Sequence, residues 1–212
     1  MMPTGMAEQL LYECQAIRTG HFVLSSGAHS DMFVAKSEVT VFPGITIALA
    51  DEMANRLYDD KIEVVVAPVI GAVVIGFAVA YHLNQLRPGS TVYSVYAEKD
   101  GDGFSLNRGY DRLVRNRRVS IVEDIITSGD TVKRVIECVQ RSGGRVTAVG
   151  CLWNRAGTTA EKLGVESFTA LVDRALSKWS ATPDDPCPLC RDGVPVNTEL
   201  GHGAEFIARL SA

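Results

Sequence analysis

Apolar and polar positions alternate in two different ways along the central part of the chain. The run at 62–67 is continuous and β-branched, which is typical of a strand buried on both faces of a sheet. Segments with apolar residues at helical spacing, the clearest at 130–143, lie between this run and the later strand-like runs. Further strand-like runs lie at 91–97, 117–124, 145–155 and 167–172. This order predicts an α/β fold with a mostly parallel central sheet, flanked by helices and joined by right-handed crossovers.

The two ends of the chain are patterned differently from its centre. Residues 7–17 and 45–60 are helix-like, and 20–39 is strand-like with Ser-Gly turn signals. The end of the chain holds four prolines and little periodicity, which predicts an ordered but irregular tail. A chain of 212 residues without a low-complexity linker is expected to form one domain. Its expected parts are a hood at about 7–40, a core at about 41–172 and a tail at about 173–212.

Composition narrows the class of protein. The hydrophobic fraction of 46% and the charged fraction of 22% are ordinary for a globular protein. A net charge of -4 provides no basic surface for sequence-independent nucleic-acid binding, so we expect no nucleic-acid partner. The longest apolar stretch, 64–80, is interrupted by Pro68, Gly71 and Gly76, so we expect no membrane span. The N-terminus lacks the pattern of a signal peptide, and we expect a cytoplasmic protein.

The stretch SIVEDIITSGDTV at 120–132 carries the clearest chemistry. Glu123 and Asp124 follow a buried apolar run, where carboxylates are costly unless something binds them. Ligands of open parallel sheets lie beyond the carboxyl ends of the strands. The small residues at 127–131 lead into a helix N-terminus, whose unpaired N–H groups favour a phosphate. Because carboxylates accept hydrogen bonds from vicinal hydroxyls, the pattern predicts a sugar-phosphate site.

Other interpretations of these loops fit less well. A capped helix with surface acids would not need apolar residues on both sides of the acids. The stretch GAVVIGFA at 71–78 has glycines at Walker spacing, but Phe77 and Ala78 stand where Lys and Ser or Thr are required. A dinucleotide fingerprint is absent as well. The sugar-phosphate interpretation is therefore preferred.

The same stretch resembles the phosphoribosyl-pyrophosphate motif of type I phosphoribosyltransferases. Five further segments resemble orotate phosphoribosyltransferases in the same order, the last of them a bacterial or archaeal subgroup with a Cys-Pro-Leu-Cys tail. These segments are TGHFVLSSGAHSD (19–31), APVIGAVVIG (67–76), YAEKDGDGFSLNRGY (96–110), WNRAG (153–157) and CPLCRDGVPV (187–196). The resemblance extends from about residue 8 to 203 and implies the type I phosphoribosyltransferase fold.

The resemblance implies an activity. Members of this family transfer ribose 5-phosphate from phosphoribosyl pyrophosphate to N1 of orotate, giving orotidine 5′-phosphate and pyrophosphate in pyrimidine biosynthesis. It also implies Mg²⁺ carried by the substrate, without direct protein ligands, and a homodimer that shares the 98–109 loop across its interface. Two alternatives stay open: a phosphoribosyltransferase for another base, and a non-catalytic regulator that senses phosphoribosyl pyrophosphate.

Site residues follow from the same resemblance. Those expected to bind phosphoribosyl pyrophosphate are Gly71, Glu123, Asp124, Ile125, Ile126, Thr127, Ser128, Gly129, Asp130 and Thr131. Those expected to contact orotate are Thr127, Arg155, Ser25 and Ser26, and the expected catalytic residues are Lys99, Arg108 and Asp124. The planar fork of Arg155 matches the orotate carboxylate, although a surface arginine at a strand end is the plainer alternative.

The chain departs from the family pattern at several charged positions. Ser25 and Gly71 stand where many members carry lysine, and Lys99 and Arg108 are the cations that remain in the 98–108 loop. Lys36 is expected near a phosphate. Asp130 replaces a small uncharged residue, and we expect its side chain to point outward and cap the following helix.

The cysteines form two groups. Cys14, Cys138 and Cys151 are scattered among apolar residues, which indicates a reducing compartment. Cys187 and Cys190 form a single CxxC, for which tail packing, a weak zinc site and a redox pair all stay open. Zinc needs four ligands, and the nearest extra candidate in the sequence is His202, whereas His21 and His29 are expected to be structural.

Overall fold

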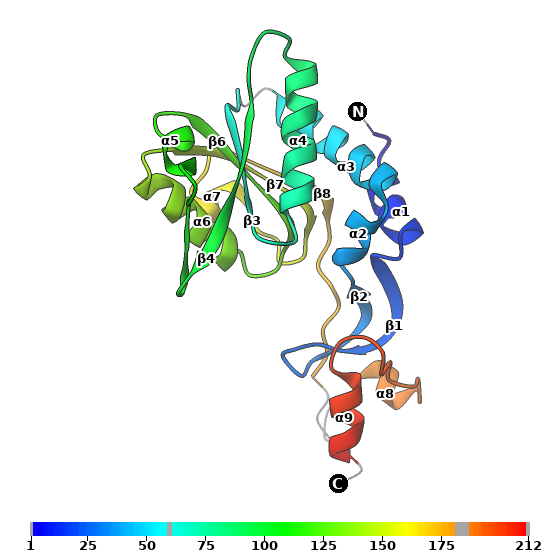
Figure 1. Ribbon diagram of the computed structural model, residues 1–212. Helices are drawn as coiled ribbons and strands as arrows, with labels where there is room; N and C mark the ends of the chain where they lie inside the picture. The colour runs from blue at the N-terminus through cyan, green and yellow to red at the C-terminus, as the bar shows by residue number, and fades with distance from the viewer. Residues whose placement is uncertain (1, 59–60, 181–186, 211–212) are drawn as a thin grey trace.

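The computed structural model describes residues 2–58, 61–180 and 187–210 (Figure 1). Its elements in chain order are α1 (Met6–Glu13), β1 (Ile17–Val23), β2 (His29–Val34), α2 (Ser37–Val41), α3 (Pro43–Arg56), β3 (Val64–Pro68), α4 (Val73–Leu86), β4 (Tyr93–Asp100), β5 (Gly103–Ser105), α5 (Tyr110–Val114), β6 (Arg118–Ile126), α6 (Asp130–Arg141), β7 (Arg145–Asn154), α7 (Ala160–Leu163), β8 (Ser167–Asp173), α8 (Pro188–Arg191) and α9 (Gly203–Leu210).

A six-stranded sheet forms the centre of the molecule. Its strand order is β5-β4-β3-β6-β7-β8, and every neighbouring pair is parallel except β4 and β5. All five residues of β3 are buried, as the continuous apolar run predicts. Val65 packs in one core cluster with residues of α3 and α4, whereas Val64 and Val66 pack in a second cluster with α6. The predicted α/β fold with a mostly parallel sheet between helices is therefore confirmed.

Helix α6 illustrates how the apolar pattern builds one of these layers. Val132, Val135, Ile136 and Val139 recur at helical spacing and are buried against the sheet. The helix ends before Gly143, whose φ of 82° is the left-handed conformation that glycine adopts readily. The predicted helix over 130–143 thus starts where expected and stops two residues earlier.

The polar segment 98–111 contains a hairpin followed by a short helix. Strands β4 and β5 pair antiparallel, with Lys99 opposite Phe104. Helix α5 then begins at Tyr110. The polar, Gly-rich composition of the hairpin concealed how far β4 extends past the apolar run at 91–97.

A second, two-stranded sheet stands apart from the first. Strands β1 and β2 form a hairpin beyond one end of the central sheet, and the chain after β8 runs back beside it to α8 and α9 (Figure 1). His29 and Trp179 exchange two backbone hydrogen bonds of 2.9 Å. The N–H groups of Asn197 and His202 donate to the carbonyls of His21 and Val23. The tail, expected to be irregular, therefore carries two helices and is bonded to the hairpin.

None of the helices in the described part of the chain is long and apolar enough to cross a membrane.

Candidate functional site

The main cavity lies where the sheet topology reverses. From β3 the chain passes through α4 to β4 on one side, and from β6 it passes through α6 to β7 on the other. Ligands of open α/β sheets bind at such a switch point, beyond the carboxyl ends of the strands. A cavity of about 620 Å³ opens there. Its lining includes Phe33, Lys36, Gly71, Lys99, Phe104, Glu123, Asp124, Ile125, Thr127, Thr131, Arg155 and Leu200.

Two buried acids form one wall of this cavity. Strand β6 pairs with β3 only as far as Ile121, so Glu123 and Asp124 extend past the last pair. Their exposed fractions are 7% and 2%. Lys36 Nζ lies 3.1 Å from Asp124 Oδ2. Burial, together with the neighbouring charge of Asp124, raises the pKa of Glu123 to about 8. The fold therefore keeps a costly acid pair beside an open space, as a ligand site requires.

The loop after β6 leads directly into α6. Thr127 and Thr131 line the cavity, and Gly129, at a φ of 86°, is the N-cap residue immediately before α6. The N-cap position is Gly129, which has no side chain to cap the helix, so the expected cap by Asp130 does not form. Asp130 does point outward: it is exposed and accepts a hydrogen bond of 2.7 Å from the Ser128 hydroxyl. Ile126 is buried in the core beneath the loop and does not line the cavity.

The β3–α4 loop approaches the acids closely. A β-carbon added at Gly71 would overlap the Asp124 carboxylate and would lie 3.5 Å from Lys36 Nζ. Only glycine fits at this point without movement of a neighbour. Gly71 therefore lines the cavity directly beside Asp124.

Arg155 enters the cavity from the end of β7. Its backbone N–H donates to the Ile126 carbonyl at 2.9 Å, which continues the β6–β7 pairing and fixes where the side chain starts. The side chain is partly buried, and burial lowers the pKa of its guanidinium. Its buried Nε has no hydrogen-bond partner among the described residues, and no carboxylate of that part of the chain pairs with it. A buried guanidinium without an anion suits an anionic ligand.

The remaining predicted residues divide into two groups. Lys99 lines the cavity from the end of β4, together with the acids. Arg108 lies outside it: its side chain is 61% exposed and its Nη2 lies 3.4 Å from Glu98 Oε1. Ser25 and Ser26 lie in the turn of the β1–β2 hairpin and are not among the residues that line the cavity.

Several apolar residues of the cavity wall are missing from the sequence prediction, and the largest of them are Phe33, Phe104 and Leu200. Phe33, Phe104 and Leu200 come from β2, β5 and the tail. None carries a group that marks a motif, and only the folded chain brings them together. They supply apolar surface, beside a few polar groups, of the kind that suits a planar ring.

The fold and the site define a phosphoribosyltransferase. The phosphoribosyl transferase domain family matches residues 42–184. A solved orotate phosphoribosyltransferase of Mycobacterium tuberculosis, in complex with 5-phospho-α-D-ribosyl 1-diphosphate, superposes with a TM-score of 0.60 at 22% identity. The match covers 79% of this chain and 94% of that structure, and it shows the shared fold.

Two curated relatives are more specific. The orotate phosphoribosyltransferase of Caldicellulosiruptor bescii is 32% identical over 188 residues, which cover 89% of this chain and 92% of the relative. The orotate phosphoribosyltransferase of Thermotoga maritima is 33% identical over 198 residues, which cover 93% of this chain and 99% of the relative. The chain therefore belongs to the orotate phosphoribosyltransferase family.

Proposed function

We propose that this protein transfers ribose 5-phosphate from phosphoribosyl pyrophosphate to N1 of orotate. The bond from C1 of the ribose to N1 forms as the bond from C1 to pyrophosphate breaks, the acidic N1 gives up its proton, and orotidine 5′-phosphate and pyrophosphate are released. One observation carries the proposal: a cavity at the sheet's switch point joins the acid pair Glu123 and Asp124 to the partly buried Arg155, which pairs with no carboxylate among the described residues. The names of the curated relatives agree with it.

Each part of the substrates has a partner in this cavity. The N-terminus of α6 and the hydroxyls of Thr127 and Thr131 suit the 5′-phosphate. The acid pair suits the ribose hydroxyls, and Arg155 suits the orotate carboxylate as a two-pronged donor. Lys99 supplies positive charge for the departing pyrophosphate. Catalysis then rests on positioning and on neutralisation of the leaving charge.

The acid pair also fits a magnesium ion that arrives with its substrate. Magnesium prefers carboxylate oxygens and water and is usually held jointly by protein acids and substrate phosphates. Glu123 and Asp124 line the same cavity and would hold the ion through its waters. When bound, Mg²⁺ offsets the negative charge of the pyrophosphate.

The functional unit in this proposal is a homodimer. An apolar groove of about 480 Å³ lies between α3 and α4, and its lining includes Ile47, Val74, Phe77 and Tyr81. Each of these side chains is at least half exposed. A second copy of the chain would cover this surface and would bring its own 98–109 loop towards the neighbouring site. We also place the protein in the cytoplasm, because Cys14, Cys138 and Cys151 are free thiols.

A turnover assay tests the proposal. Purified protein with phosphoribosyl pyrophosphate, Mg²⁺ and orotate is expected to consume orotate, followed by its ultraviolet absorbance. Asp124→Asn should impair the use of phosphoribosyl pyrophosphate with any base, whereas Asp51→Asn, an exposed control on α3, should not. Turnover of adenine, hypoxanthine or uracil alone would reject orotate as the substrate. Binding of phosphoribosyl pyrophosphate without turnover of any base would favour the regulator.

A further inference from the structure

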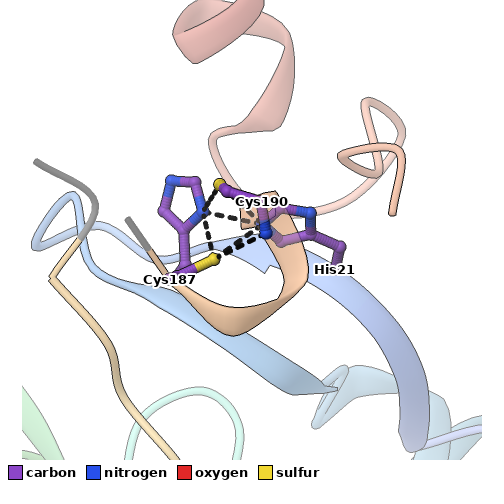
Figure 2. A group of neighbouring side chains, drawn as sticks. His21, Cys187 and Cys190 are labelled. Carbon is purple, nitrogen blue, oxygen red and sulfur yellow. Dashed lines mark hydrogen bonds between the residues drawn. The ribbon is translucent and has the colours of Figure 1, made fainter. Parts of the chain in front are cut away.

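Four potential metal ligands meet where the tail lies on the β1–β2 hairpin. His21 comes from β1, His29 from β2, and Cys187 and Cys190 from the start of α8. Figure 2 shows the side chains of His21, Cys187 and Cys190 converging on one point. One ligand atom from each of the four residues lies within 4.8 Å of all the others. The cluster is buried apart from Cys190, which is partly exposed.

The four sulfur–nitrogen distances are close to those of a zinc tetrahedron. Cys187 Sγ lies 3.5 Å from His21 Nε2 and 3.4 Å from His29 Nδ1. Cys190 Sγ lies 3.7 Å and 3.4 Å from the same two nitrogens. Zinc–sulfur bonds of about 2.3 Å and zinc–nitrogen bonds of about 2.0 Å place tetrahedral sulfur and nitrogen ligands about 3.5 Å apart. The two nitrogens are 2.7 Å apart, so the rings would separate slightly around an ion.

Neighbouring groups already orient two of the ligands. His21 Nδ1 lies 2.7 Å from the Val194 carbonyl, which only accepts, so this nitrogen carries the proton and Nε2 presents its lone pair to the cluster. Metal-binding histidines are commonly held in this way. The Cys190 N–H donates to Cys187 Sγ at 3.2 Å, as suits a thiolate ligand.

Without an ion, the cluster leaves a polar atom unpaired. His29 donating from Nδ1 to His21 Nε2 would explain the 2.7 Å contact. His29 Nε2 would then be a buried acceptor, and it has no hydrogen-bond partner in the described part of the chain. His202, the extra ligand considered from the sequence, is exposed and lies 3.4 Å from Glu205. Instead, the two histidines of the hairpin, His21 and His29, complete the set of ligands that Cys187 and Cys190 begin.

We propose that His21, His29, Cys187 and Cys190 form a structural zinc site that holds the C-terminal tail on the β1–β2 hairpin. Two thiolates and two imidazoles in a closed tetrahedron are a donor set typical of structural zinc. None of the four residues lines the proposed active-site cavity. The tail that the ion holds does reach it, because Leu200 forms part of the cavity wall. The site is independent of the proposed transferase activity.

Metal analysis of the full-length protein, purified without a histidine tag, tests this site. About one zinc per chain is expected by plasma mass spectrometry, and Co²⁺ in its place should give the visible absorption of a tetrahedral thiolate complex. Cys187→Ser and His29→Ala should each lose the metal. The matched controls Cys14→Ser and His202→Ala should retain it, since neither residue belongs to the cluster.

A second measurement, on the wild-type chain, tests the site even if the variants fail to fold. Addition of zinc to the metal-free wild-type chain should raise the urea midpoint of unfolding and protect the tail from limited proteolysis. Three results would overturn the proposal: no zinc and no Co²⁺ spectrum after metal supplementation, metal retained by Cys187→Ser, or a Cys187–Cys190 disulfide in protein purified under reducing conditions. Because these readouts need no substrate, they stand even if orotate turnover fails.

Discussion

At the scale of single residues, Glu123 is the acid whose titration the fold changes most clearly. Its pKa is about 8 in the folded chain and 4.5 ordinarily. The contribution of this carboxyl to the free energy of unfolding is therefore complete below pH 4.5 and is lost as the pH rises through 8. Glu123→Gln removes this loss and should raise the free energy of unfolding by roughly 2–4 kcal/mol at about pH 9, with little gain at about pH 4. Urea unfolding at both pH values measures the difference. Glu166→Gln, an exposed control, should show no such gain, and parallel pH profiles for wild type and Glu123→Gln would contradict the prediction.

Arg155 is the residue on which base selectivity rests. Loss of a bidentate, charge-assisted pair costs about 2–4 kcal/mol, so Arg155→Ala should lower kcat/KM for orotate by roughly 30–1000-fold. Arg155→Lys keeps the charge without the fork and should recover only part of the loss. Calorimetric titration should show nearly unchanged binding of phosphoribosyl pyrophosphate. Equal losses for both substrates would mean that Arg155 supports the whole site instead of orotate.

The start of α6 links an element to its ligand. Asp130 lies in the first helical turn, where a negative charge stabilises the helix but opposes a bound phosphate. Asp130→Asn should strengthen binding of phosphoribosyl pyrophosphate about 2–5-fold at low salt and cost about 0.5 kcal/mol of stability. Ser128→Ala is the matched control, because it removes the hydrogen bond between the two side chains and keeps the charge. Weaker binding by Asp130→Asn in a calorimetric titration would show that the carboxylate has a positive role.

Elements with strong periodicity were predictable from the sequence, and those defined by tertiary contacts were not. The β-branched run at 62–67 predicted β3, and the apolar residues at helical spacing over 130–143 predicted α6. The cap by Asp130 failed because Gly129 turns the chain into the helix with a left-handed φ, which leaves Asp130 already helical. Helix α9 was missed because most of its residues are exposed and it packs against a hairpin distant in sequence.

At the scale of the whole molecule, the motif residues of the site were predictable and their long-range partners were not. The acid pair and Arg155 stand at strand ends, so the parallel sheet brings them to one edge. The pairing of Lys36 with Asp124 joins residues 88 positions apart. The histidines that meet Cys187 precede it by 158 and 166 positions. Local pattern carries no information about which distant segments meet.

The proposed homodimer makes a prediction that only the assembled molecule can satisfy. Phe77 is 64% exposed in the apolar groove, so Phe77→Lys should convert the dimer to a monomer in analytical ultracentrifugation. Leu210→Lys, which changes an apolar residue exposed to 70% on α9, is the matched control and should remain dimeric. A wild-type chain that is monomeric at all concentrations would reject the dimer.

Sharing of the 98–109 loop has its own test. Arg108 does not line the cavity of its own chain, and a role in the neighbouring site would explain its exposure. Arg108→Ala and Asp124→Asn should then each impair turnover as homodimers. Re-associated mixtures should recover roughly a quarter of wild-type activity, because half of the dimers are mixed and each mixed dimer holds one intact site of two. An inactive mixture, with mixed dimers shown by native mass spectrometry, would place Arg108 in the site of its own chain, and a fully active Arg108→Ala homodimer would place it outside the reaction.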